Sequence, residues 1–241
     1  MLLFAVDKLI SLYGSHHINI STYQHINPQT LKPLNPQSFQ FSTHKMLYSI
    51  FDNMERCTPD EVQRLLPLVP EEHQAIALKF KHTFGQFATV KSILMLKELL
   101  VANGMIPQDD SLHFEYNAHG KPHLASHPDI HFNISHCPHA IAVAVDSAPI
   151  GVDVERFVSP SESLLNYCLN DEEVQQVKQS DCPEQTFAAF WTKKEALFKM
   201  RGTGITHELR DILTHLQPDE RLETTLYKEK KFAFTLALTN R

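Results

Sequence analysis

Alternating apolar and polar positions between residues 130 and 155 predict strands joined by tight turns. In segments 140–145 and 150–155, a β-branched residue recurs at every second position, which is the period of a β-strand. The sequence Asp146-Ser-Ala-Pro149 between them is rich in turn-forming residues. We therefore expect these two segments to form a hairpin, and we expect another strand before it that ends at His136.

The second strand of this hairpin places two carboxylates on one face. Because side chains alternate along a strand, Gly151, Asp153 and Glu155 point away from the side of the β-branched residues. Residues two apart lie roughly 6.5–7 Å apart along a strand, so both carboxylates can bind one divalent cation. Gly151 would leave room for a ligand above the sheet. The alternative is a solvated face that carries two charges by chance.

A second stretch, residues 187–204, predicts a helix that ends at Gly202. Its residues Glu195 and Lys199 stand four positions apart and share a face with Trp191. The carboxylate could therefore reach a ligand through a metal ion, and the ammonium could bind a phosphate directly. The alternative is an ordinary surface ion pair, which contributes only a few tenths of a kcal/mol.

These two stretches and two shorter motifs resemble the Sfp-type 4′-phosphopantetheinyl transferases. The matching motifs are HGKP (119–122), FNISH (132–136), PIGVDVE (149–155) and FWTKKEALFK with a following GTG (190–199 and 202–204). They occur in the family's order and at family-like spacing, and the resemblance extends from about residue 46 to the C-terminus. Without it, the residues themselves indicate only a site for a metal ion and a phosphate.

The resemblance implies an α+β fold of two similar halves related by a pseudo-twofold axis, with the active site between them. The N-terminal half would be residues 46–148 and the C-terminal half residues 149–241. The order of elements in this chain also favours α+β, because strands surround long helices without a repeated βαβ unit, a G-x-G-x-x-G motif or a P-loop.

Residues 1–45 are expected to be an N-terminal extension. The apolar stretch 1–12 is short, is interrupted by Asp7 and Lys8, and resembles neither a signal peptide nor a membrane span. The polar sequence that follows predicts a loop or disorder. Family members typically open with a strand, which residues 46–51 would form here, so one hypothesis is that translation starts at Met46. The alternative is an arm that packs on the domain.

The implied reaction transfers 4′-phosphopantetheine from coenzyme A, the co-substrate, to a serine of an apo acyl or peptidyl carrier protein. Adenosine 3′,5′-bisphosphate is released. The matched motifs assign Asp153, Glu155 and Glu195 to Mg²⁺, an ion that prefers oxygen ligands. Glu195 is also the candidate general base for the serine, directly or through a metal-bound water. Lys199 would neutralise the pyrophosphate and help the leaving group.

The resemblance further implies residues that contact coenzyme A, namely Lys121, Pro122, Ser135, His136, Asp153 and Lys199. Taken alone, Lys121 would be an ordinary turn lysine, and His136 has a structural role as its alternative. The family also has a basic residue, usually arginine, at the position of Ala88. The candidate replacements near it are surface-type lysines, namely Lys79, Lys81 and Lys91.

Composition narrows the class of protein. The chain has 241 residues, of which 42% are hydrophobic, enough for a sizeable core. Its net charge of −6 argues against a nucleic-acid binder. The four cysteines show no C-x-x-C spacing, and the fifteen histidines form no H-E-x-x-H motif, so reduced, packed thiols are expected rather than a structural zinc. We expect a cytoplasmic monomer that does not bind membranes.

Two other classes of function remain open. A metal-dependent hydrolase of nucleotide pyrophosphates would use the same cation and lysine, but it would need a richer glutamate cluster than residues 192–200 provide. A non-catalytic module that binds coenzyme A or a carrier protein would explain the absence of arginine at Ala88. Such a module would have no need for the four residues Asp153, Glu155, Glu195 and Lys199.

Overall fold

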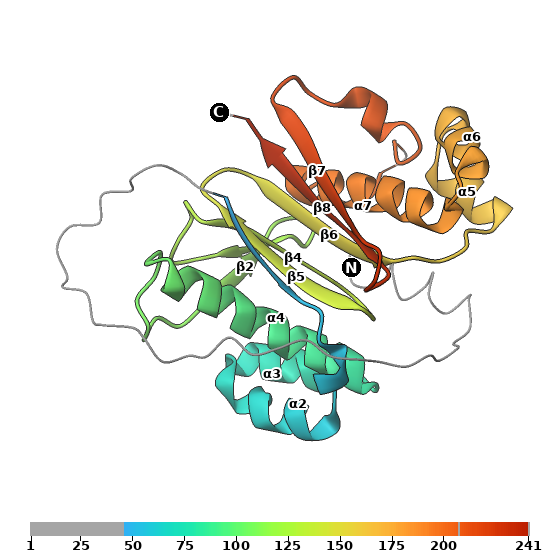
Figure 1. Ribbon diagram of the computed structural model, residues 1–241. Helices are drawn as coiled ribbons and strands as arrows, with labels where there is room; N and C mark the ends of the chain where they lie inside the picture. Colours follow the sequence, from blue (N-terminus) through green and yellow to red (C-terminus); the bar gives the residue numbers. More distant parts are fainter. Residues whose placement is uncertain (1–45, 207, 241) are drawn as a thin grey trace. The chain divides into compact units, whose positions relative to one another are not determined.

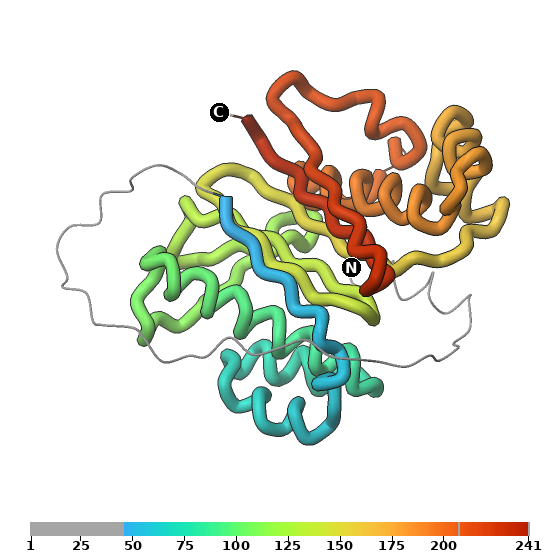
Figure 2. The backbone as a smooth tube through the Cα atoms, viewed as in Figure 1, coloured from blue at the N-terminus to red at the C-terminus, as the bar shows by residue number. Residues whose placement is uncertain are grey.

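The computed structural model describes residues 46–206 and 208–240, which belong to one compact unit of the chain (Figure 1). The expectations for residues 1–45 lie outside the described residues. The strand expected at residues 46–51 is present as β1 (Leu47–Phe51). We call residues 46–148 the first half and residues 149–240 the second half. Figure 2 shows the path of the chain through both.

The first half combines a three-stranded antiparallel sheet with a group of helices. In chain order its elements are β1 (Leu47–Phe51), η1 (Met54–Arg56), α2 (Pro59–Leu65), η2 (Leu66–Leu68), α3 (Glu71–Leu78), α4 (Thr83–Ala102), β2 (Phe114–Tyr116), β3 (Pro122–Leu124), β4 (His131–Cys137) and β5 (Ala140–Asp146). The strand order in the sheet is β1-β5-β4, and β2 pairs with β3 as a separate small hairpin.

The second half repeats this arrangement of strands. Its elements are β6 (Ile150–Arg156), α5 (Glu162–Cys168), α6 (Asp171–Gln179), α7 (Pro183–Arg201), η3 (Ile212–His215), β7 (Glu220–Tyr227) and β8 (Phe232–Thr239). The strand order is β6-β8-β7, so in both halves the first strand pairs with the last one. The α+β class is therefore confirmed. The axis that would relate the two halves remains a prediction.

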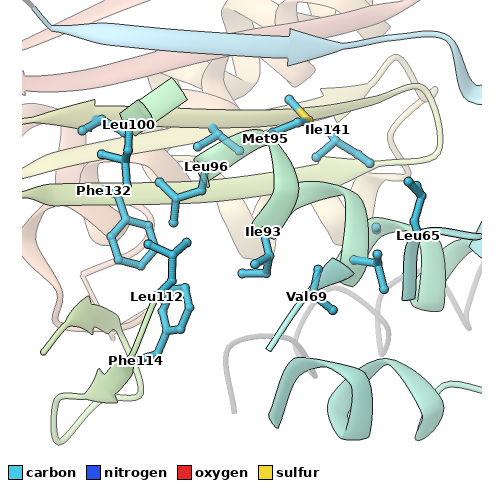
Figure 3. Packing of buried hydrophobic residues seen from close by; sticks show 14 of the residues in the cluster. Leu65, Val69, Ile93, Met95, Leu96, Leu100, Leu112, Phe114, Phe132 and Ile141 are labelled. Atoms are coloured by element: carbon cyan, nitrogen blue, oxygen red, sulfur yellow. The ribbon is translucent and has the colours of Figure 1, made fainter. Parts of the chain in front are cut away.

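Two apolar layers lie on the two faces of the first sheet. The first lies between α4 with its neighbouring helices and one face of the first sheet, where Leu96 and Leu100 are near Phe132 and Ile141 (Figure 3). The second lies between the two sheets and combines the alanines of β5 with apolar side chains of β6 and β8. Because side chains alternate, β5 presents its large residues to α4 and its small ones to the second sheet. Small residues let the sheets approach closely.

The predicted hairpin of residues 140–155 is wrong in its pairing. Both strands exist, but β5 pairs with β1 and β4, whereas β6 pairs with β8. The turn at residues 146–149 therefore passes from one sheet to the other. The physical reason is that β5 is a central strand with both edges occupied. The hairpin that does form joins β4 to β5.

Two local predictions are confirmed, namely the helix that ends at Gly202 and the free, packed thiols. Helix α7 ends at Gly202, whose φ of 69° is left-handed, as a glycine cap requires. All four cysteines are free, and Cys137 and Cys168 are buried, as expected for reduced, packed thiols. Among the described residues, no helix is both long and apolar enough to cross a bilayer.

Candidate functional site

Strands β4 and β6 adjoin through side chains. The Oδ1 atom of Asn133 accepts a hydrogen bond from the backbone N–H of Val152 (2.9 Å), and Oγ of Ser135 accepts one from the N–H of Val154 (3.3 Å). No backbone ladder joins β4 to β6 in the described residues. We call this junction the seam. It brings the FNISH motif of the first half beside the PIGVDVE motif of the second half.

Helix α7 crosses β6 at Gly151, and there is no space for a side chain at this point. A Cβ atom on Gly151 would lie 1.9 Å from the carbonyl oxygen of Ala196 and 2.6 Å from the backbone nitrogen of Met200. The prediction that Gly151 leaves room for a ligand is therefore wrong, because the backbone of α7 fills that room. The glycine instead lets the helix approach the strand closely, which brings Glu195 and Lys199 to the face that carries Asp153.

Lys199 joins both sides of the seam. Its Nζ atom donates hydrogen bonds to Oδ1 of Asp153 (2.5 Å) and to Oγ of Ser135 (3.0 Å). Ser135 in turn donates to Oδ1 of Asp153 (2.7 Å). Asp153 and Glu195 are buried. Both alternative interpretations from the sequence are therefore excluded. The strand face with Asp153 is not solvated, and Glu195 and Lys199 do not form a surface ion pair.

Glu195 is a buried carboxylate with an unsatisfied oxygen. Among residues 46–206 and 208–240, its Oε1 atom has no hydrogen-bond partner. Burial raises the pKa of Glu195 to about 7, with the charge of Lys199 opposing this shift and that of Asp153 adding to it. A buried acceptor without a donor is costly unless a ligand supplies the missing partner.

Glu155 and Lys199 complete the electrostatics of the site. Burial and the nearby charge of Asp153 raise the pKa of Glu155 to about 7, although its Oε1 accepts a hydrogen bond from the N–H of Arg156 (2.8 Å). Burial alone would lower the pKa of Lys199, but the carboxylates, led by Asp153 and Glu195, more than offset it and raise that pKa. The site has more negative than positive charge.

This excess of carboxylate oxygen fits a divalent cation. The unpartnered Oε1 of Glu195 and the raised pKa values of Glu155 and Glu195 are effects that a nearby cation would relieve. An all-oxygen donor set suits Mg²⁺ better than zinc. In the described residues no three side chains of the metal-binding types already form a closed cluster. A cation would therefore have to draw these carboxylates together.

The predicted phosphate contact Lys121 reaches the C-terminal end of α7, the helix that carries Glu195 and Lys199. The Nζ atom of Lys121 donates to the carbonyl oxygens of Met200 (3.1 Å) and Ile150 (3.4 Å). Pro122, the next residue, begins β3. The β2–β3 hairpin of the first half thus contacts the elements of the second half that carry the acidic residues.

His136 and Ser135 point to opposite faces of β4. The ring of His136 packs edge-on against Phe84 at the start of α4, with the ring centroids 5.6 Å apart. The structure therefore brings Ser135 to the acidic residues and places the His136 ring beside α4. Sequence reasoning missed Asn133, which binds β6 as Ser135 does. The sequence could have indicated this role, because Asn133 and Ser135 are two positions apart in one predicted strand and therefore share a face.

The position of Ala88 cannot present a basic side chain to solvent. Ala88 is completely buried in the core of the first half. Of the three candidate replacements, Lys79 and Lys81 are exposed, whereas the Nζ atom of Lys91 lies 4.9 Å from the centre of the Phe51 ring. Lys79 and Lys81 therefore remain the accessible candidates.

Because the ammonium of Lys121 is partly buried, the free energy of unfolding should depend on pH in the alkaline range. Burial lowers the pKa of Lys121 from 10.5 to about 8. Between these values the unfolded chain binds a proton that the folded chain has lost, so the free energy of unfolding rises with pH. We expect wild type to gain stability relative to Lys121→Met from pH 8 upward, as measured by urea denaturation. Lys79→Met controls for the loss of one charge, and a constant difference would contradict the prediction.

Comparisons with known proteins identify similar sequences. Residues 149–239 match the model of the 4′-phosphopantetheinyl transferase superfamily. The chain is 27% identical over 161 residues to 4′-phosphopantetheinyl transferase psf-1 of Bacillus pumilus, covering 66% of this chain and 69% of the relative. It is 26% identical over 183 residues to 4′-phosphopantetheinyl transferase Sfp of Bacillus subtilis (strain 168), covering 75% and 80%.

A shorter and closer match is to 4′-phosphopantetheinyl transferase AcpT of Salmonella typhimurium, with 35% identity over 94 residues, 36% of this chain and 48% of the relative. The matched range, residues 149–239, is that of a 4′-phosphopantetheinyl transferase superfamily domain, and the longer matches are to proteins named 4′-phosphopantetheinyl transferases. The resemblance to the Sfp type is confirmed by the relatives that share most of the chain's length.

Proposed function

We propose that this protein transfers the 4′-phosphopantetheine group of coenzyme A to a serine of an apo acyl or peptidyl carrier protein and releases adenosine 3′,5′-bisphosphate. The observation that supports this best is the convergence of motif residues from both halves. Lys199 of α7 contacts Ser135 of β4 and Asp153 of β6, and α7 also carries the unpartnered carboxylate of Glu195.

In this reaction the serine oxygen forms a bond to the β-phosphorus of coenzyme A, and the bond to the bridging oxygen of the pyrophosphate breaks. Glu195 would accept the serine proton, because a carboxyl group with a pKa near 7 is suited to general base catalysis. Lys199 would stabilise the negative charge on the pyrophosphate. Asp153, Glu155 and Glu195 would hold Mg²⁺, which supplies further neutralisation of phosphate charge when bound.

The remaining contacts to coenzyme A follow from the motifs. Ser135 would offer its hydroxyl to a phosphate, and Lys121, Pro122 and His136 would contribute from the first half. The two halves would be related by a pseudo-twofold axis, with this site between them. We further propose that the protein acts as a cytoplasmic monomer that binds neither nucleic acid nor membranes.

The reaction can be tested by incubating the purified protein with coenzyme A, Mg²⁺ and an apo acyl carrier protein, and then measuring the intact mass of the carrier. We expect a gain of one phosphopantetheine group that disappears when the cation is chelated. No gain with several carriers, despite coenzyme A binding, would instead favour a binding module. Release of the bisphosphate without a carrier would favour a pyrophosphate hydrolase.

A further inference from the structure

The turn between β2 and β3 is organised by one side chain, that of Asn117. Its Oδ1 atom accepts hydrogen bonds from the backbone N–H groups of His119 and Lys121, each at 2.9 Å. The backbone of Asn117 also donates to the carbonyl oxygen of Lys121 (3.0 Å) and accepts from Gly120 (2.9 Å). Asn117 therefore fixes the backbone conformation from which the Lys121 side chain leaves.

The same amide also binds the second half. The Nδ2 atom of Asn117 donates to the carbonyl oxygen of Gly202, 85 positions further along the chain, at 3.3 Å. Gly202 is the left-handed C-cap of α7. Its lack of a side chain matters here, because a Cβ atom would lie 3.3 Å from Cδ of Lys121 and 3.4 Å from Nδ2 of Asn117. Both polar atoms of the Asn117 amide are thus engaged, and they act in different halves.

These contacts place Lys121 against the two elements that carry the acidic residues. Its ammonium reaches Met200 at the end of α7 and Ile150 at the start of β6. A cation at the C-terminus of a helix is also electrostatically favourable. The position of this charge is therefore set by the turn, and the turn is set by Asn117.

We propose that Asn117 is a positioning residue, which holds Lys121 where its ammonium can bind the pyrophosphate of coenzyme A. This inference rests on the proposed function. Asn117 does not touch the reacting atoms, so its removal should weaken binding of coenzyme A and leave the chemical step intact. The substitution should therefore raise KM and the dissociation constant of coenzyme A and leave kcat almost unchanged.

The test compares Asn117→Ala with Asn103→Ala. Asn103 is the matched control, because its Nδ2 also donates to a helix carbonyl, that of Leu99 (2.8 Å), but at the end of α4. We expect Asn117→Ala to raise KM for coenzyme A about five- to tenfold, the effect of losing one or two hydrogen bonds. In calorimetry without a carrier, the dissociation constant should rise equally. Asn103→Ala should change neither.

A double variant separates positioning from general destabilisation. If Asn117 acts through Lys121, adding Asn117→Ala to Lys121→Met should raise KM no further. Asn117→Asp retains an oxygen for the turn but lacks the donor to Gly202, so it should fold and give an intermediate KM. An unchanged KM for Asn117→Ala, or a full effect in the Lys121→Met background, would overturn the inference alone. A wild-type protein that neither binds coenzyme A nor transfers its group would overturn the proposed function and the inference with it.

Discussion

Replacing Glu195 by alanine is expected to abolish phosphopantetheine transfer while the protein remains folded. Glu195 is the proposed general base and one of the three proposed cation ligands, so its removal affects both proton transfer and charge neutralisation. General base catalysis alone contributes about 10²–10⁴-fold. We therefore expect kcat to fall by at least roughly 10³-fold. Intact-mass measurement of the carrier over time gives this rate.

The fold should survive this change because Glu195 contributes little to it. Its Oε1 atom has no hydrogen-bond partner in the part of the chain that the structure describes, and burial disfavours its charge. We expect the melting temperature to stay close to that of wild type in circular dichroism. Glu195→Gln tests the charge at nearly constant volume, and Glu172→Gln is the control for an exposed acid on α6. A folded Glu195→Ala variant with full activity would refute the catalytic role.

Replacing Gly151 by alanine is expected to displace α7 from β6. The new Cβ would overlap with backbone atoms of Ala196 and Met200, and no change of rotamer can relieve a clash with backbone. Overpacking of this kind costs about 1–3 kcal/mol and occasionally more. Because a shift of about 1 Å in a catalytic group can cost roughly 10²-fold in rate, activity should fall further than stability alone would require. Urea denaturation and kcat/KM measure the two effects.

Gly104→Ala is the control for this substitution. Gly104 follows α4 in the first half, and its φ of 67° means that alanine there adds the strain of a left-handed residue. That strain costs about 1–2 kcal/mol. If Gly151→Ala retained the transfer rate of Gly104→Ala, the close approach of α7 to β6 would not be needed for the site.

The local features of this fold could be predicted from the sequence, whereas the pairing of its strands could not. Helix α7 and its stop at Gly202 follow from propensity and the glycine cap, both of which act within a few residues. The partner of a strand depends on residues far along the chain. Periodicity identified β5 and β6 correctly, but it carried no information on whether a turn folds back or crosses to another sheet.

The candidate site shows the same division. The motifs identified Asp153, Glu195 and Lys199, and the structure brings them close together. Helical spacing, however, offered an ion pair of Glu195 with Lys199 as the alternative, whereas the ammonium binds Asp153 on another element. The role of Gly151 could not be predicted from the sequence either, because only the path of α7 shows that the space above Gly151 is filled.

The seam between β4 and β6 links the alignment of the two halves to the occupancy of the site. A backbone ladder holds strands through many repeated bonds, whereas here the side chains of Asn133 and Ser135 satisfy the amides of β6. The hydroxyl of Ser135 serves both the amide of Val154 and the ion pair of Lys199 with Asp153. A ligand that recruits this hydroxyl competes with the hydrogen bond that joins the halves, so we expect substrate binding and the relative register of the two sheets to be thermodynamically coupled.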